Sequence, residues 1–341
     1  MSLQSDPCTL WPDYRPTTLA VLPGLAQQLQ VANVYAKLEN ERPLGNFKAL
    51  GGMTAGLRAL ARASGGTGAH RHPHSPRSAP HLICASEGNH GLSVAAAAQR
   101  AGAKATIYLP ANANPIRANR IKAIGGEVHW IDGTYDDAVL AASEAAARGE
   151  GLLIPDTSPD ANDPVVRDVM AGYELLTREI RDQLQTPPTH VFVQAGVGGL
   201  AAAVANGLSD FMSDPRRFLV VEPESAACVS RALAVGRPVS ISGDLHTSAE
   251  MLACGLASAS AIEILKRHNA HSILVSEPQL QVAVDVLLKA GGPQTTPSGA
   301  ASLAGLLHAA SDTRLRVEHL LTPKSVVLFL VTERAASSTP D

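Results

Sequence analysis

A lysine stands where this chain could do covalent chemistry. Lys48 lies in the stretch "ERPLGNFKALGG", Glu41 to Gly52, directly after the turn residues Gly45 and Asn46 and just inside an apolar helical pattern. A buried ε-amine can act as a base or form a Schiff base with an aldehyde. The alternative is an ordinary surface lysine, which the preceding turn and the scarcity of neighbouring charges argue against. We therefore take Lys48 as a candidate catalytic residue.

A glycine-rich loop far along the chain could bind a phosphate. The stretch "QAGVGGLAAAVA" follows the apolar run "THVFV" and opens a helical pattern. Glycines let backbone N–H groups converge on an anion, and a helix N-terminus favours negative charge. The loop also satisfies a dinucleotide-binding fingerprint as Gly196-x-Gly198-x-x-Ala201, with Glu222 as the acidic residue for the ribose. The loop could therefore bind a single phosphate or a dinucleotide, or be a tight turn without ligand.

A second loop, "SEGNHG" from Ser86 to Gly91, also joins a strand to the start of a helix. Its serine, asparagine and glycines offer donors that could hold a carboxylate or a phenolate oxygen. Together with Lys48 and the glycine-rich loop, these groups match the needs of one cofactor, pyridoxal 5'-phosphate (PLP). That cofactor requires a lysine for its aldehyde, an anion site for its phosphate, a donor for its phenolic oxygen and a residue facing its pyridine nitrogen.

Most parts of PLP then have a candidate partner in this chain. Lys48 can form the Schiff base, and Asn89 can donate to the phenolic oxygen. The residues expected at the phosphate are Gly196, Val197, Gly198, Gly199 and Leu200. The residues expected at a substrate carboxylate are Ser86, Gly88, Asn89 and His90. The pattern predicts a PLP enzyme that acts on a small amino acid.

Composition fits such an enzyme and argues against several other classes of protein. The chain has 341 residues, of which 45% are hydrophobic and 17% charged, as in ordinary soluble globular proteins. Its net charge of -3 gives no reason to expect nucleic acid or an anionic membrane as a partner. We expect no leader segment and no membrane span. The four cysteines are Cys8, Cys84, Cys228 and Cys254. Their spacing is typical neither of a zinc site nor of a disulfide framework, which predicts a cytoplasmic protein.

The elements that must position these residues alternate between strands and helices. From about His81 onward, short apolar runs alternate with longer Ala- and Leu-rich helical patterns. This predicts an α/β fold of mostly parallel twisted sheets flanked by helices. The connector "TSPDANDP", Thr157 to Pro164, marks a domain boundary. Ser64 to Pro80 is expected to be an exposed loop. Its histidines could bind a metal but have no acidic or cysteine ligand nearby: His70, His72 and His74.

Four motifs together carry a resemblance to a known family. "GNFKALGG", "ASEGNHGLSVAAAAQRAGAKATIYLP", "QAGVGGLAAAVA" and "VVLFLVTE" resemble, in this order, the fold-type II PLP enzymes, the superfamily of the tryptophan synthase β-chain and threonine dehydratase. The similarity runs from about Asn33 to Thr332, and within the superfamily the chain looks most like the diaminopropionate ammonia-lyases. The resemblance implies a homodimer whose subunit has a small domain, residues 47–160, and a large PLP-phosphate-binding domain, residues 1–46 and 161–341, with the cofactor between them.

The resemblance also implies two residues beside the cofactor. Phe47, next to the lysine in the family motif, is expected to bind PLP. Thr332 ends the apolar run "SVVLFLV" and matches the position that faces the pyridine nitrogen. A hydroxyl there does not hold that nitrogen protonated, which favours β-elimination over transamination. Without the other motifs, Thr332 would be interpreted as an ordinary residue at a strand end.

Two carboxylates match acid/base residues of the ammonia-lyases. Glu87 stands where that family has an Asp, and Asp156 matches a second Asp. The extra methylene of Glu87 moves its carboxylate relative to the family residue. Serine and threonine dehydratases usually have a small residue at this position, so Glu87 favours a diamine substrate. The structural alternatives are a charge near a helix N-terminus for Glu87 and a turn or capping residue for Asp156.

These residues together predict a PLP-dependent β-elimination. The amine of Lys48, with its pKa lowered by burial, would take the α-proton of 2,3-diaminopropionate. The β-amine would leave, and the resulting aminoacrylate would hydrolyse to pyruvate and ammonia. The substrate stays open, because Thr296 or Pro297 stands where relatives commonly have a Glu. The alternatives are a serine, threonine or 3-hydroxyaspartate dehydratase of the same fold, a nicotinamide dehydrogenase, and a cofactor- or amino-acid-binding protein.

Overall fold

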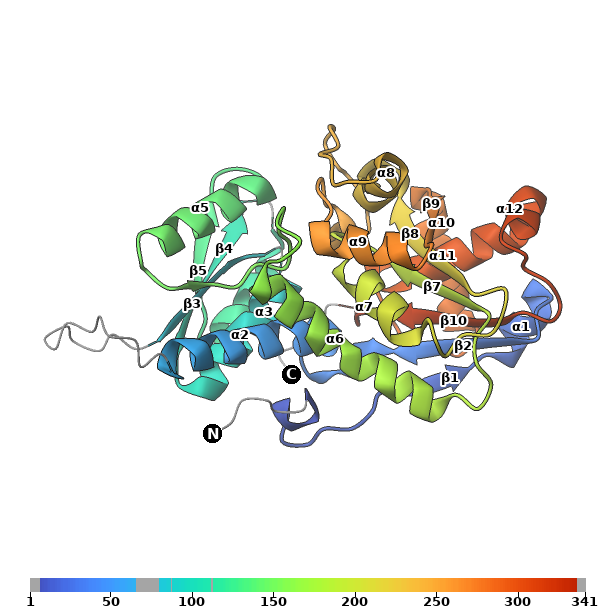
Figure 1. Ribbon diagram of the computed structural model, residues 1–341, viewed down its shortest axis with the longest axis horizontal. Helices are drawn as coiled ribbons and strands as arrows, with labels where there is room; N and C mark the ends of the chain where they lie inside the picture. The colour runs from blue at the N-terminus through green and yellow to red at the C-terminus, as the bar shows by residue number, and fades with distance from the viewer. Residues whose placement is uncertain (1–6, 66–79, 87, 112, 336–341) are drawn as a thin grey trace, which may run out of the picture.

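The chain folds around two separate β-sheets (Figure 1). The computed structural model describes residues 7–65, 80–86, 88–111 and 113–335. The strands of the larger sheet are β1 (Leu19–Val21), β2 (Asn33–Leu38), β7 (His190–Gln194), β8 (Arg217–Pro223), β9 (His271–Val275) and β10 (Val326–Val331). They lie in the order β1-β2-β10-β7-β8-β9, and all neighbours are parallel except β1 and β2. The strands of the smaller sheet are all parallel and lie in the order β5 (Glu127–Ile131), β4 (Lys104–Pro110), β3 (His81–Ala85) and β6 (Leu152–Leu153).

Helices follow most of the strands and cover both sheets. Their bounds are α1 (Pro23–Leu29), α2 (Lys48–Gly65), α3 (Asn89–Ala101), α4 (Pro115–Ala123), α5 (Tyr135–Ala147), α6 (Pro164–Gln183), α7 (Gly199–Leu208), α8 (Cys228–Val235), α9 (Ala259–Arg267), α10 (Glu277–Lys289), α11 (Pro297–Ser311) and α12 (Thr313–Glu318). Within the described residues, none of these helices combines the length and the apolarity that a membrane span requires.

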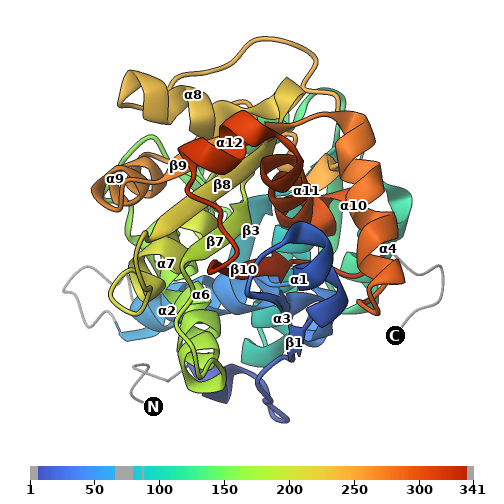
Figure 2. The same cartoon turned by 90° about the vertical axis from the view of Figure 1, so that its right-hand side faces the viewer.

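The central strands β7 and β10 of the larger sheet are buried on both faces. On β10, Val327, Phe329 and Val331 belong to the core cluster shared with α10 and α11. Leu328 and Leu330 alternate with them and belong to the cluster shared with α6 and α7. Figure 2 shows α10 and α11 on one side of this sheet and α6 and α7 on the other. A strand between two helical layers is apolar at every position, which explains the continuous apolar runs in the sequence.

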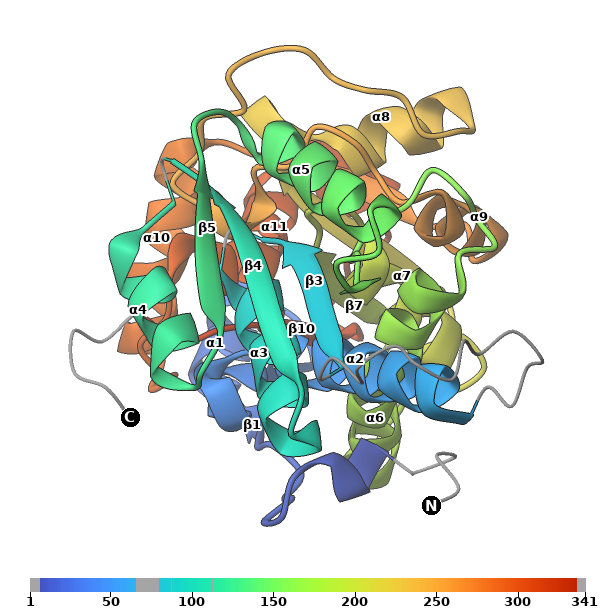
Figure 3. The same cartoon turned by 90° about the vertical axis from the view of Figure 1, so that its left-hand side faces the viewer.

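In the smaller sheet, β3 is covered by helices on both faces in the same way (Figure 3). On β3, Leu82 and Cys84 pack into the cluster shared with α2 and α3. Ile83 and Ala85 point to the opposite face and pack into a second cluster with α5. The two sheets and their helices confirm the predicted α/β fold of parallel sheets flanked by helices.

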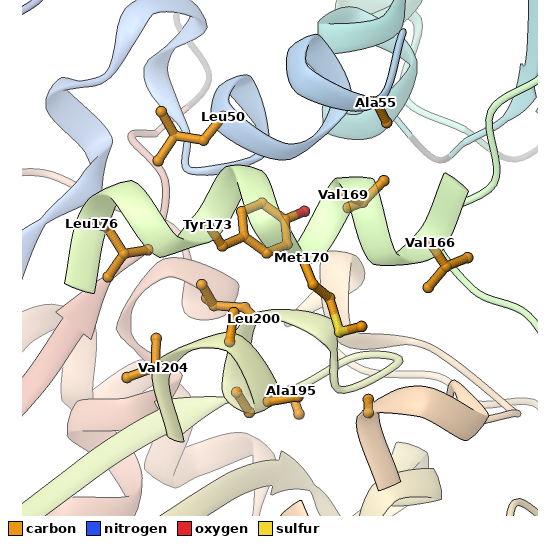
Figure 4. Packing of buried hydrophobic residues seen from close by; sticks show 14 of the residues in the cluster. Leu50, Ala55, Val166, Val169, Met170, Tyr173, Leu176, Ala195, Leu200 and Val204 are labelled. Carbon is orange, nitrogen blue, oxygen red and sulfur yellow. The ribbon is translucent and has the colours of Figure 1, made fainter. Parts of the chain in front are cut away.

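The long helix α6 packs against both halves of the molecule, touching α2 on one side and α7 on the other (Figure 4). The helix starts after Asp163, whose carboxylate accepts hydrogen bonds from backbone N–H groups of the first turn. At the crossing with α2, a Cβ on Gly172 would lie 2.5 Å from the carbonyl oxygen of Leu50, so only glycine permits this approach. The crossing brings the Tyr173 ring to 5.1 Å from the Phe47 ring.

The domain boundaries stay a prediction. All strands of the smaller sheet lie within residues 47–160, and all strands of the larger sheet lie within residues 1–46 or 161–341. We keep this division as a proposal, with α6 as the element that packs against both parts.

Candidate active site

One pocket lies at the carboxyl ends of β3, β7 and β10, where residues from both sheets meet. Open α/β sheets bind their ligands at this end of their strands. Every predicted site residue that the structure describes lines the pocket: Phe47, Lys48, Ser86, Gly88, Asn89, His90, Asp156, Gly196, Val197, Gly198, Gly199, Leu200 and Thr332. The other predicted residue, Glu87, lies outside the described residues, as do His70, His72 and His74. The chemical roles of these residues remain predictions.

Lys48 is the first residue of α2 and forms an ion pair in this pocket. Its Nζ lies 2.6 Å from Oδ2 of Asp156, which follows β6. Oδ1 of Asp156 accepts a hydrogen bond of 3.3 Å from the hydroxyl of Tyr135, a pocket residue that the sequence motifs did not predict. Asn46 positions the lysine, because its Oδ1 accepts a hydrogen bond of 3.1 Å from the Lys48 N–H. The side chains of Lys48 and Asp156 are 21% and 10% exposed, so the pair is shielded from bulk water.

This ion pair sets the charge of both groups. Burial by itself lowers the pKa of the Lys48 amine, but the Asp156 carboxylate raises it well above its ordinary range. Burial likewise raises the pKa of Asp156, and the Lys48 ammonium lowers it well below its ordinary range. The expectation that burial gives Lys48 a lowered pKa is therefore wrong for this arrangement, because the carboxylate partner outweighs burial. Both groups are charged at neutral pH.

The glycine-rich loop joins β7 to α7 and leaves room for a ligand. Gly198 precedes α7 with a φ of 94°, a left-handed conformation that favours glycine. Among the described residues, a Cβ placed on Gly199 would find only Cγ of Met170 within 4 Å, at 3.9 Å. Because Gly199 is buried and lines the pocket, this open space belongs to the pocket. A helix N-terminus beside such a space fits a phosphate.

Thr332 follows β10 and is held by Gln194, a residue that the sequence motifs did not predict. Nε2 of Gln194 donates to Oγ1 of Thr332 at 2.9 Å and to the carbonyl oxygen of Ser298 at 2.9 Å. Oε1 of Gln194 is buried and has no hydrogen-bond partner among the described residues. An unpaired polar atom in the wall of a pocket is typical of a ligand site. The available signal was a polar residue at the end of β7, directly after the apolar run Val191 to Val193.

The loop before α3 is shaped by its own serine. Oγ of Ser86 accepts hydrogen bonds from the N–H groups of Gly88 at 2.9 Å and Gly91 at 2.8 Å. His90 is buried, and its Nε2 lies 2.8 Å from the carbonyl oxygen of Ile154. Burial lowers the pKa of this imidazole, so it is neutral near pH 7. Nδ1 of His90 is buried and without a hydrogen-bond partner in the described part of the chain.

Glu333, a further pocket residue that the motifs did not predict, lies beside Asn89. Nδ2 of Asn89 donates a hydrogen bond to Oε2 of Glu333, and Oε1 of Glu333 accepts one from the Thr296 hydroxyl at 2.5 Å. Thr296 also precedes α11, where its Oγ1 accepts a hydrogen bond of 3.0 Å from Gly299 N–H, and Pro297 is the first residue of that helix. Thr296, one of the two positions at which a departure from the family pattern was expected, thus contacts the site through Glu333.

The carboxylate of Glu222 binds backbone N–H groups of the protein, and a ribose is not its partner. Its carboxylate is buried and accepts hydrogen bonds of 2.7 Å from the N–H groups of Val229 and Ser230, at the start of α8. Burial raises the pKa of Glu222 to about 8, although both N–H groups favour the ionised form. The interpretation of Glu222 as a ribose ligand is therefore wrong, and the nicotinamide dehydrogenase loses the residue on which it depended.

The chain matches a known family along most of its length. The model of the pyridoxal-phosphate dependent enzymes covers residues 10–333, so the chain belongs to this family. Diaminopropionate ammonia-lyase of Escherichia coli strain K12 is 33% identical over 268 residues, 74% of this chain and 66% of that enzyme. The chain thus spans just under two thirds of the length of this relative. The human serine dehydratase-like protein is 29% identical over 299 residues, 87% of this chain and 84% of that protein.

The fold agrees with that of solved relatives. The crystal structure of holo diaminopropionate ammonia-lyase from Escherichia coli superposes on this chain with a TM-score of 0.84 at 30% identity. The superposition covers 96% of this chain and 87% of that one. The chain therefore has the fold of the fold-type II PLP enzymes.

The residues of the pocket fit PLP, the cofactor of this family. An amine, a helix N-terminus beside open space, an amide donor and a hydroxyl converge on one pocket, at Lys48, Gly199, Asn89 and Thr332. These are the groups that the aldehyde, the phosphate, the phenolic oxygen and the ring nitrogen of PLP require. In the described ranges, no three His, Cys, Asp or Glu side chains gather as metal ligands would.

Proposed function

We propose that this protein is a PLP-dependent ammonia-lyase that eliminates the β-amine of 2,3-diaminopropionate and yields pyruvate and ammonia. The observation that carries the proposal is the Lys48–Asp156 pair, with Nζ and Oδ2 2.6 Å apart, in the pocket that also holds the glycine-rich loop. Similarity to enzymes named diaminopropionate ammonia-lyase supports the substrate.

Four parts of the pocket would hold the cofactor. Lys48 would carry its aldehyde carbon, and the segment 196–200 at the start of α7 would bind its phosphate. Asn89 would donate to the phenolic oxygen, and Thr332 would face the ring nitrogen, with Phe47 also lining the site. When bound, PLP supplies an electron sink that stabilises negative charge on the α-carbon of the substrate.

Lys48 and Asp156 are suited to move the two protons of the reaction. Lys48 Nζ, when uncharged, can take the proton released as the Cα–H bond breaks. An uncharged Lys48 no longer lowers the pKa of Asp156, and burial, the largest single effect, then raises that pKa against the opposing effects of His90 and Tyr135. Asp156 would thus be protonated when the β-amine needs a proton to leave, and ionised again once Lys48 is charged. Tyr135 would hold Oδ1 of Asp156 in place.

The start of α3 would bind the carboxylate of the substrate. Gly88, Asn89 and His90 line the pocket at a helix N-terminus, which favours an anion. Ser86 would keep the loop in shape through its hydrogen bonds to the loop N–H groups. The role proposed for Glu87, a carboxylate near the second amine of the substrate, rests on the sequence alone.

Elimination of water from a hydroxy amino acid is the second candidate function. The observation that favours it is the similarity to the human serine dehydratase-like protein, which covers 87% of this chain. Serine, threonine and 3-hydroxyaspartate would use the same lysine and the same cofactor site. The two functions differ in the group that leaves the β-carbon.

A pyruvate-release assay decides between the two functions. PLP-loaded protein would be given D- and L-2,3-diaminopropionate, D- and L-serine and 3-hydroxyaspartate in separate reactions, with oxoacid release measured from L-threonine. The proposal predicts the highest kcat/KM for a diaminopropionate enantiomer, with ammonia released alongside pyruvate. Turnover of the hydroxy amino acids without turnover of the diamine would move the assignment to the dehydratases. Absence of oxoacid from every substrate would overturn the lyase.

We further propose that the protein is a cytoplasmic homodimer. Among the described residues, Cys84 and Cys228 are buried and form no disulfide, in accord with a reducing compartment. The dimer rests on the resemblance to the family. Light scattering coupled to gel filtration tests it, since a monomeric mass for the PLP-loaded protein would contradict the proposal.

A further inference from the structure

Glu333 is a buried carboxylate for which the proposed reaction has no role. It directly follows Thr332, is 6% exposed and lines the pocket. The side chains of the described residues that are seen to donate to it, Asn89 and Thr296, are uncharged, and Arg120 interacts with it electrostatically. Burying a carboxylate costs more free energy than burying a neutral side chain of the same shape, so its presence calls for an explanation.

The position of Glu333 is fixed by its backbone and its side chain. Its carbonyl oxygen accepts a hydrogen bond from the Thr295 hydroxyl, and its backbone pairs with Asn46, two residues before Lys48. Thr296 links Oε1 of Glu333 to the start of α11, because the Thr296 hydroxyl also accepts a hydrogen bond from the N–H of Gly299. Glu333 is therefore a rigid, charged acceptor facing Asn89.

A charged acceptor decides how the Asn89 amide is oriented. An ionised carboxylate accepts hydrogen bonds and donates none, so the amide must present Nδ2 to Glu333. Nδ2 carries two N–H groups, and Glu333 engages one of them. When the first N–H of an amide donates to an anion, the amide is polarised. This changes the strength of the hydrogen bond that its second N–H can donate. That second N–H belongs to a side chain that lines the pocket.

We propose that Glu333 is the positioning residue for Asn89, which it fixes as an N–H donor toward the phenolic oxygen of PLP. The inference rests on the proposed function, in that it takes PLP as the ligand and Asn89 as its partner. Glu333 acts through Asn89 and leaves the reacting atoms to Lys48 and Asp156. Asn89 and Glu333 come from segments 244 positions apart, so the contact also ties the start of α3 to the end of β10.

A double-mutant cycle on PLP binding tests this inference. Apo protein would be titrated with PLP, and Kd and the ratio of the absorbance bands of the bound cofactor measured, for the parent chain, Glu333→Gln, Asn89→Ala and the double variant. Glu333→Gln keeps the shape of the side chain and removes its charge. Glu263→Gln, the same substitution at an exposed position of α9, is the matched control. The melting temperature of each apo variant shows that it is folded.

The inference predicts that Glu333→Gln weakens PLP binding roughly tenfold and changes the band ratio, because the charge that orients the Asn89 amide is lost. In the Asn89→Ala background the same change should alter Kd less than about twofold, since no amide is left to orient. Equal effects in both backgrounds would overturn the role of Glu333 and leave the cofactor assignment intact. A folded parent chain that binds no PLP would overturn both.

Discussion

Lys48 and Asp156 are 108 positions apart in the chain, yet Nζ of one lies 2.6 Å from Oδ2 of the other. The lysine opens α2, and the aspartate follows the last strand of the smaller sheet. Each group holds its partner in the charged form, because burial alone would favour the neutral form of both. The pair therefore responds as a unit when either member gains or loses a proton.

Asp156→Asn should change cofactor capture and turnover in opposite directions. PLP reacts with an uncharged amine, and Asp156 raises the pKa of Lys48, so capture by the parent protein should speed up as the pH rises. Removing the carboxylate leaves burial to lower that pKa, so the variant should capture PLP faster at neutral pH. Turnover should fall by about 10²- to 10⁴-fold, because a proton donor is lost. Stopped-flow absorbance measures capture, and pyruvate release measures turnover.

The matched control for this prediction is Asp160→Asn, at an exposed position a few residues along. It should leave both the capture rate and its pH dependence unchanged. Slower PLP capture by Asp156→Asn at neutral pH would show that the carboxylate assists the lysine in another way.

Two neighbouring glycines should respond differently to alanine. At Gly199 the added Cβ enters open pocket space, so Gly199→Ala should weaken PLP or phosphate binding while the melting temperature of the apo protein stays nearly constant. At Gly198 the φ of 94° is strained for alanine, and the Cβ would lie 3.2 Å from Cγ2 of Val229. Gly198→Ala should therefore destabilise the fold by about 1–2 kcal/mol. Calorimetric titration with inorganic phosphate and thermal unfolding separate the two effects.

If the two alanine variants lose phosphate binding and stability in equal measure, the loop is a structural turn and the space at Gly199 is not the anion site. Phosphate binding by Gly199→Ala as tight as by the parent protein would lead to the same conclusion.

A buried ion cluster should stabilise the fold against acid. Glu179 on α6 accepts hydrogen bonds of 2.6 Å from both Lys37 on β2 and Arg42, and all three side chains are almost fully buried. Burial raises the pKa of Glu179, but Arg42 and Lys37 lower it overall. The stabilisation that these ion pairs give the fold is thus present above the ordinary pKa of a glutamate. It is lost as the pH falls through the lowered pKa of Glu179 in the folded protein. Glu179→Gln should cost about 3–5 kcal/mol at neutral pH, measured by urea unfolding.

The exposed ion pair of Arg181 and Asp210, also 2.6 Å long, supplies the control. Asp210→Asn should change the unfolding midpoint far less, because solvent screens that pair. A loss of stability by Glu179→Gln that is no larger than that of Asp210→Asn, or a parent protein as stable at pH 3 as at pH 7, would contradict the account.

Local sequence predicted the fold and part of the site well, because the motifs lie at the ends of strands or the starts of helices. Lys48 and the segment 196–200 follow turns whose glycines are visible in the sequence, and parallel strands bring such junctions to the same edge of a sheet. Gln194 and Glu333 were not predicted, since their importance comes from hydrogen bonds to residues 138 and 244 positions away. The pKa of Lys48 was mispredicted for the same reason, because Asp156 is distant in the chain.

The measurement that tests the central claim most directly is the site of cofactor attachment. The PLP-loaded protein would be reduced with borohydride and digested, and its peptides mapped by mass spectrometry. The account predicts that the added mass of reduced PLP lies on Lys48 and that Lys48→Ala, folded by circular dichroism, retains no cofactor after reduction. Labelling of a different lysine, or stoichiometric labelling of Lys48→Ala, would contradict the account.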